Sequence, residues 1–170
     1  CLQSACPRDE AFVREFVQTC ASYARTGAEV LWLDDDMRMQ NHAPVQNGCF
    51  CDACVARFNA LQGTAFTRDA LVRALLKDHY PRPNALRLAW LHYNHNALVD
   101  LTRAVARAVF AVNPSIGMGH MPVGVELTVY DLPDYASLGA PMVNAKGQVY
   151  YRPGGLFWND GSPTDLIHKA

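Results

Sequence analysis

Four apolar residues followed by three aspartates form the stretch Val30-Leu31-Trp32-Leu33-Asp34-Asp35-Asp36. The short, nearly continuous apolar run is typical of a parallel strand that is buried on both faces. The acids follow at its carboxyl end, where α/β barrels carry their functional side chains. Because side chains alternate along a strand, Asp34 and Asp36 should share one face and Asp35 the other. The spacing leaves open which of them points inward.

Helical and extended segments alternate around this strand. Apolar residues recur at helical spacing before it, and Thr67 and Asn84 are typical N-cap residues for later helices. Helices are expected over about residues 9–26, 52–62, 67–76, 84–112 and 130–138. Further strands are expected over residues 115–121 and 148–152, with a strand or turn over residues 141–145. This order predicts an α/β fold with a parallel sheet.

Composition and length narrow the class of protein. The 170 residues are enough for one domain with a hydrophobic core, since half of them are hydrophobic and 18% are charged. A formal net charge of -1 does not favour nucleic-acid binding, and no apolar run approaches the roughly 18 residues of a membrane span. The chain opens on Cys1 without an initiator methionine, so we expect an excerpt of a longer protein. The crowding of three cysteines within six positions favours thiolates in a reducing compartment, and therefore a cytoplasmic location.

Three of the six cysteines are crowded into the segment Cys49-Phe50-Cys51-Asp52-Ala53-Cys54. This C-x-C-x2-C spacing is too tight for ordinary disulfide pairing and is typical of a thiolate metal site. A tetrahedral site needs a fourth ligand, for which Cys6 is the best candidate and Cys1 and His42 are alternatives. Cys20 lies on the apolar face of its helix and should belong to the core. The competing interpretation is a secreted domain in which the six cysteines form disulfides.

Several polar residues at the ends of expected strands are weaker candidates for a site. The aspartates could instead be solvated or paired with Arg38, and His120 or Arg152 could be purely structural. Trp158 could stack on a sugar or simply pack in a loop. The histidines and asparagines at residues 92–96 lack an H-E-x-x-H arrangement, and we interpret them as helix surface. Fingerprints of dinucleotide binding, nucleotide binding and serine hydrolysis are absent.

Cys6-Pro7, a following helix, Trp32 on a strand ending in acids, and residues 48–58 together resemble the family 42 glycoside hydrolases. The chain is also similar to uncharacterised bacterial relatives of that family. The resemblance implies a (β/α)8 TIM barrel, of which residues 1–170 would be one partial catalytic domain, from the end of the third strand through the sixth helix. It further implies that a structural zinc ion is bound by four cysteines, namely Cys6, Cys49, Cys51 and Cys54.

The resemblance implies hydrolysis of an O-glycosidic bond in a β-galactosidase-like reaction by strand-end carboxylates. The family has Asn-Glu where this chain has Asp35-Asp36, so Asp36, and next Asp35, are the expected catalytic residues. A second carboxylate would lie beyond Ala170, and the full-length protein could form a homo-oligomer. The alternative is a non-catalytic carbohydrate-binding barrel that lost its acid. The residues expected to bind the carbohydrate substrate are Asp34, His120, Arg152 and Trp158.

Overall fold

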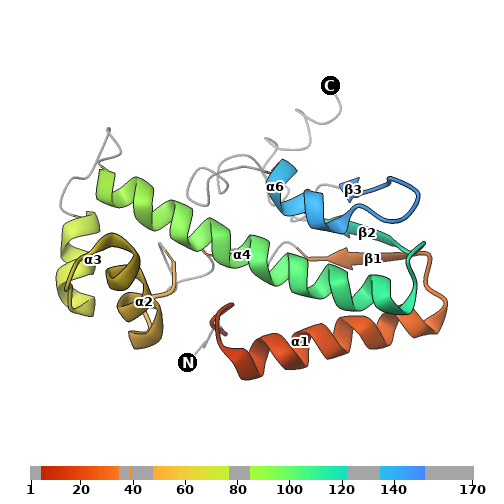
Figure 1. Cartoon of the computed structure of the whole chain (residues 1–170), viewed down its shortest axis with the longest axis horizontal. Helices are drawn as coiled ribbons and strands as arrows, with labels where there is room; N and C mark the ends of the chain where they lie inside the picture. Colours follow the sequence, from red (N-terminus) through yellow and green to blue (C-terminus); the bar gives the residue numbers. More distant parts are fainter. Residues whose placement is uncertain (1–4, 35–38, 40–47, 77–84, 122–134, 152–170) are drawn as a thin grey trace, which may run out of the picture.

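A computed structural model of the chain describes residues 5–34, 39, 48–76, 85–121 and 135–151 (Figure 1). These residues are mostly helical and include a small three-stranded parallel sheet. The helices are α1 (Glu10–Tyr23), α2 (Asp52–Gln62), α3 (Arg68–Leu76), α4 (Ala85–Val112) and α6 (Tyr135–Gly139), with 3-10 helices η1 (Ala24–Thr26) and η2 (Ala140–Met142). The strands are β1 (Val30–Leu33), β2 (Gly117–His120) and β3 (Tyr150–Tyr151).

The sheet has the strand order β1-β2-β3, and both strand pairs are parallel. Leu33 at the end of β1 is in register with His120 at the end of β2, so the two carboxyl ends lie side by side. Between them the chain passes through α2, α3 and α4, because a parallel pair needs a long crossover connection. Gly119 is needed in β2, since a Cβ atom there would collide with the ring of Trp32, which packs edge-on against Tyr150.

The largest group of buried apolar residues, which we call the sheet cluster, lies where α1 and α4 pack along the sheet (Figure 1). Val105, Val109 and Met118 are completely buried in it. Burying each such side chain contributes roughly 1.5–3 kcal/mol. The buried members of the sheet cluster are Cys20, Ala24, Leu33, Leu101, Val105, Ala106, Val109, Ile116, Met118 and Met142.

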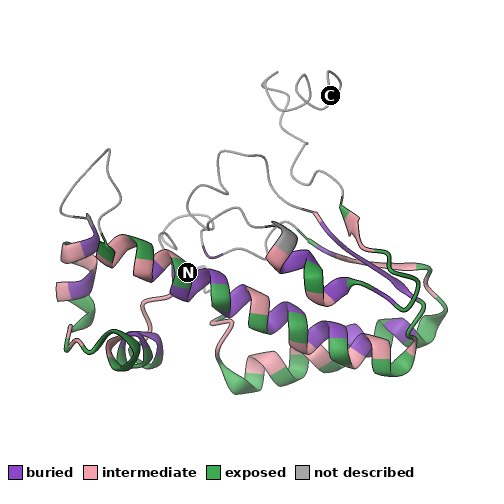
Figure 2. Ribbon diagram, turned by 45° about the horizontal axis from the view of Figure 1, so that its top comes forward, coloured by how far each residue is buried: buried purple, intermediate pink, exposed green. Residues whose placement is uncertain are grey.

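A second group, which we call the aromatic cluster, lies where α2 and α3 meet the amino-terminal half of α4. Phe58 is completely buried and packs edge-on against Trp90, with ring centroids 4.9 Å apart. Phe50 stacks on Trp90 at 4.7 Å. Buried residues follow α4 along most of its length, so this helix serves both clusters (Figure 2). The buried members of the aromatic cluster are Cys54, Val55, Phe58, Leu71, Leu75, Trp90 and Tyr93.

Side-chain caps set the starts of two helices, and the cap at Thr67 is the one that the sequence predicts. Asp9 caps α1, where its side chain accepts a hydrogen bond from the Phe12 amide at 2.8 Å. Thr67 caps α3 in the same way, since its hydroxyl accepts from the Ala70 amide at 3.2 Å. Such caps are typically worth about 1 kcal/mol. The expected cap Asn84 lies outside the described residues, and the helix expected over residues 130–138 is described only from Tyr135.

The prediction of a partial (β/α)8 TIM barrel is wrong. Such a barrel closes eight parallel strands into a ring that helices surround. In the described part of the chain the strands are only four, four and two residues long, and α2 and α3 build a separate cluster beside the sheet. The alternation of helices and strands does predict the observed parallel pairing. It carries no information on whether a sheet closes, because closure depends on strand number and stagger.

None of the described helices combines the length and the apolar character that a membrane span requires. The longest, α4, has 28 residues but carries charged and polar side chains along its exposed face.

Candidate metal centre

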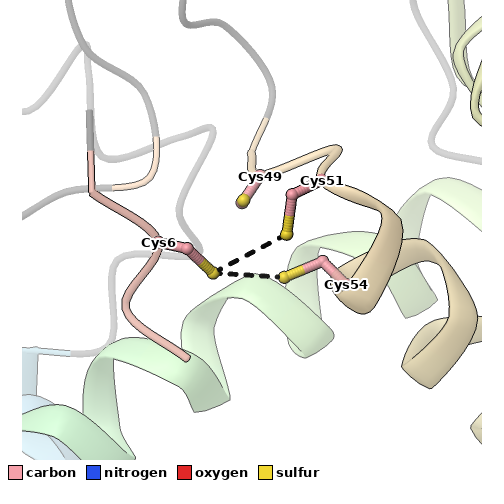
Figure 3. A group of neighbouring side chains, drawn as sticks. All are labelled: Cys6, Cys49, Cys51 and Cys54. Atoms are coloured by element: carbon pink, nitrogen blue, oxygen red, sulfur yellow. Dashed lines mark hydrogen bonds between the residues drawn. The ribbon is translucent and has the colours of Figure 1, made fainter. Parts of the chain in front are cut away.

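Four cysteine sulfur atoms converge between the segment before α1 and the start of α2 (Figure 3). The sulfur atoms of Cys6, Cys49, Cys51 and Cys54 all lie within 4.8 Å of one another. Cys6 Sγ is 3.5 Å from Cys54 Sγ and 3.9 Å from Cys51 Sγ, and none of the four is in a disulfide. The fold therefore gathers thiols up to 48 positions apart in the sequence into a group that could hold a metal ion.

The start of α2 fixes two of the four sulfur atoms. Cys51 is the N-cap residue, with an extended backbone conformation, and its carbonyl accepts the first helical hydrogen bond from the Val55 amide at 3.0 Å. Cys54 lies in the first turn, where residues three apart share one side of a helix. Its side chain is buried in the aromatic cluster, whereas Cys51 packs at the edge of that cluster. The helix start thus presents both thiols in one direction.

Gly48, directly before Cys49, approaches α4 more closely than a residue with a side chain could. Gly48 has φ +106°, which favours glycine, and a Cβ atom there would collide with the side chain of Asn94. Asn94 is only 2% exposed. The interpretation of this part of the helix as surface is therefore wrong for Asn94 and His95, which are buried, and right for His92 and Asn96, which are exposed. A glycine directly before a C-x-C motif was the one signal available in the sequence.

Arg8 connects the first cysteine to α4. Its backbone amide donates a hydrogen bond to Cys6 Sγ at 3.4 Å. Its guanidinium group donates to the Tyr93 carbonyl oxygen at 3.2 Å and lies 4.6 Å from the centre of the Tyr93 ring. A weaker ion pair joins it to Asp100 at 3.7 Å. These contacts hold the Cys6 segment against the helix that carries the aromatic cluster.

Each thiol changes the pKa of its neighbours, because their sulfur atoms lie close enough to form hydrogen bonds with one another. The hydrogen bond from Cys54 lowers the pKa of the Cys49 thiol to about 5. That same pair interaction, with burial, raises the pKa of Cys54, and burial raises the pKa of Cys6 to about 11. Without a metal ion these shifts favour the thiolate form of Cys49 and the protonated forms of Cys6 and Cys54. A metal ion would have to displace these protons.

The buried hydroxyl group of Tyr93 lies beside the sulfur group. It interacts with the thiol of Cys54. Burial, and next the neighbouring Cys54, raise the pKa of Tyr93, so the hydroxyl keeps its proton. A protonated donor beside Cys54 suits a centre in which the sulfur atoms are metal-bound thiolates, since a thiolate can accept its hydrogen bond.

Other predicted site residues do not join this group. Asp35, Asp36, Arg152 and Trp158 lie outside the described residues, as do the alternative ligands Cys1 and His42. Cys20 is buried in the sheet cluster, as the sequence predicts. Within the described ranges the four cysteines are the only group of three or more cysteine, histidine or acidic side chains that could share a metal ion.

Asp34 and His120 do lie at the same edge of the sheet. Asp34 is exposed directly after β1, and His120 is the last residue of β2. His120 is only 6% exposed, and neither of its ring nitrogens has a hydrogen-bond partner among the described residues. Burial lowers the pKa of His120 and so favours its neutral form. Binding of a carbohydrate by these residues stays a prediction.

No protein-family model, curated protein or solved structure matched this chain. The assignment to the family 42 glycoside hydrolases therefore stays a prediction that rests on the residues of the sequence alone.

Proposed function

We propose that the four cysteines bind one zinc ion in a closed structural site, which fastens the Cys6 segment and the 49–51 loop to α2. The observation that carries this proposal is the convergence of four sulfur atoms within 4.8 Å. Four thiolates around one zinc ion leave no open coordination position, so the ion would stabilise the fold and take no part in a reaction.

The distances support a single ion in tetrahedral geometry. A zinc–sulfur bond of about 2.3 Å places the sulfur atoms of a regular tetrahedron about 3.8 Å apart. The measured separations of 3.5 Å and 3.9 Å lie on either side of that value. The remaining separations are at most 4.8 Å, so shifts of about 1 Å would bring all four sulfur atoms to the tetrahedral spacing.

The choice of zinc follows from the ligands. Four soft thiolates favour zinc or iron over magnesium and calcium, which prefer oxygen ligands. A multi-iron cluster would need the sulfur atoms spread around its own inorganic core, whereas these sulfur atoms surround space for one ion. Among single ions, zinc is the usual occupant of a structural four-cysteine site.

The proposed ion would link the Cys6 segment and the 49–51 loop to α2, where burial of apolar area alone holds them weakly. Cys6, Cys49 and Cys51 lie at the margin of the aromatic cluster, packed against it and only partly buried. Loose margins of this kind lose conformational entropy on folding and gain little from burial. Bonds to a metal ion offset that loss, and binding to the native state alone raises its stability.

The test is the metal content of the protein purified without chelators, measured by mass spectrometry beside a count of free thiols. We expect about one zinc ion per chain in the wild type and a large loss in a Cys54→Ser variant. Cys20→Ala is the matched control, because it also removes a thiol but from the sheet cluster, and it should keep the zinc. A metal-free wild type, or one that holds iron instead, would contradict the proposal.

A further inference from the structure

A cleft of about 360 Å³ opens to solvent directly beside the four cysteines. Three of the four line it, which are Cys6, Cys51 and Cys54, whereas Cys49 does not. The proposed metal centre is therefore shielded by protein on one side and accessible on the other. The remaining residues that line the cleft are Arg8, Asp9, Glu10, Ala11, Ala53 and Arg57.

From this arrangement we propose that the centre is an oxidation site, at which a small hydroperoxide converts Cys6 and Cys54 to a disulfide and releases the metal ion. The inference rests on the proposed zinc site. It assigns to the cleft a chemical role that a merely structural metal site does not need.

The charges of the cleft select the class of oxidant. Arg8 and Arg57 balance Asp9 and Glu10, so the net charge at the lining is that of the proposed centre, which is negative because four thiolates outweigh one zinc ion. An anionic oxidant, such as the disulfide of an acidic peptide, would gain no attraction from this negative centre. A neutral hydroperoxide needs none, and its small size suits a cleft near the lower limit of ligand pockets.

The reaction balances in two steps. The Cys6 thiolate attacks the peroxide, so that a sulfur–oxygen bond forms, the oxygen–oxygen bond breaks and hydroxide leaves. The Cys54 thiolate then attacks the resulting sulfenic acid, so that a sulfur–sulfur bond forms and a second hydroxide leaves. Two thiolates lose two electrons, hydrogen peroxide gains them, and both hydroxides become water by taking protons from the buffer. Zinc keeps its charge and is left with two of its four ligands.

Among the three cysteines that line the cleft, the geometry favours Cys6 and Cys54 as the pair. Their sulfur atoms are 3.5 Å apart, closer than the 3.9 Å between Cys6 and Cys51. A Cys6–Cys54 disulfide would also replace the metal as the link between the segment before α1 and α2. A bond between Cys51 and Cys54 would connect only one turn of the same helix. Oxidation would thus release the metal ion, while the new disulfide keeps the segment before α1 attached to α2 and the aromatic cluster.

The test adds hydrogen peroxide to the zinc-loaded protein and follows zinc release with a coloured chelator, with peptide mapping of the product. We expect one zinc ion released per chain, a Cys6–Cys54 disulfide, and recovery of zinc binding after reduction. Protein that never holds zinc would contradict the proposed function itself. Zinc-loaded protein that resists peroxide, or a disulfide that contains Cys51, would overturn the present inference alone.

A pair of variants tests whether the cleft is the route. Ala53→Phe places a large side chain in the cleft, whereas Ala60→Phe makes the same change on an exposed part of α2 away from it. After both are loaded with zinc, release by peroxide should be several-fold slower in Ala53→Phe and unchanged in Ala60→Phe. Equal release rates in the two variants would show that the oxidant reaches the centre by another path.

Discussion

The sheet cluster and the aromatic cluster share α4 but are stabilised in different ways. The sheet cluster is mainly aliphatic, and its central residues Val105, Val109 and Met118 are completely buried. The aromatic cluster is smaller and ends in partly buried cysteines on the side that faces the cleft. Burial of apolar area stabilises the interior of both clusters, but it contributes less at the partly buried margin of the second. The proposed metal site would stabilise that margin.

The largest expected effect is the loss of the central aromatic ring. Phe58→Ala should lower the free energy of unfolding by about 3–5 kcal/mol, because it leaves a cavity between α2 and α4. Leu61→Ala is the matched control on the same helix, since Leu61 is 67% exposed, and it should change stability by less than about 0.5 kcal/mol. Urea denaturation measures both, and similar losses would mean that α2 is not held by its buried face.

Removal of the metal should destabilise the aromatic cluster and leave the sheet cluster unchanged. At zinc concentrations about one hundred times the dissociation constant, stripping the ion should cost about 2.7 kcal/mol. Hydrogen exchange should then lose protection in α2, whereas β2 and the carboxyl-terminal half of α4 keep theirs. Equal loss of protection in both clusters would contradict the claim that the metal ion stabilises the aromatic cluster alone.

Replacement of Arg8, which links the Cys6 segment to α4, should lower the free energy of unfolding by a smaller amount. Arg8→Ala should cost about 1.5 kcal/mol, because the charged donor to the Tyr93 carbonyl is lost from a side chain that is only 16% exposed. It should also weaken zinc binding, since the same residue holds the Cys6 segment. Arg103→Ala is the control, because Arg103 makes an exposed ion pair with Asp100 that is worth at most about 1 kcal/mol. Unchanged zinc affinity in Arg8→Ala would show that the segment is positioned without it.

Replacement of His120, at the end of β2, should change stability least at neutral pH. Burial lowers its pKa in the folded protein below the unfolded value of about 6.5, so the unfolded chain binds more protons as the pH falls. Stability from this residue is therefore present above about pH 6.5 and is lost on acidification below it. Urea midpoints between pH 8 and 5 should fall less steeply in His120→Gln than in wild type. The exposed His92→Gln variant should keep the wild-type slope.

Local sequence signals predicted the elements well. The strand Val30–Leu33 and the helix over residues 52–62 have the bounds that the apolar pattern indicates. The pairing of Cys6 with the C-x-C-x2-C segment was also a prediction, and the structure brings these four sulfur atoms together. The prediction that Asn94 and His95 lie on the helix surface is wrong, since both are buried. The spacing of polar residues along a long helix does not show which of its faces another segment will cover.

What the sequence alone determined is local: strand and helix positions through apolar periodicity, helix starts through Asp9 and Thr67, and a tight thiol motif through covalent spacing. What only the tertiary structure decided is how these parts meet. Whether the sheet closes, which cysteine completes the group, and which thiols face the cleft all depend on contacts between segments far apart in the chain. Such contacts are fixed by packing and loop geometry, as Gly48 against Asn94 shows, and periodicity does not record them.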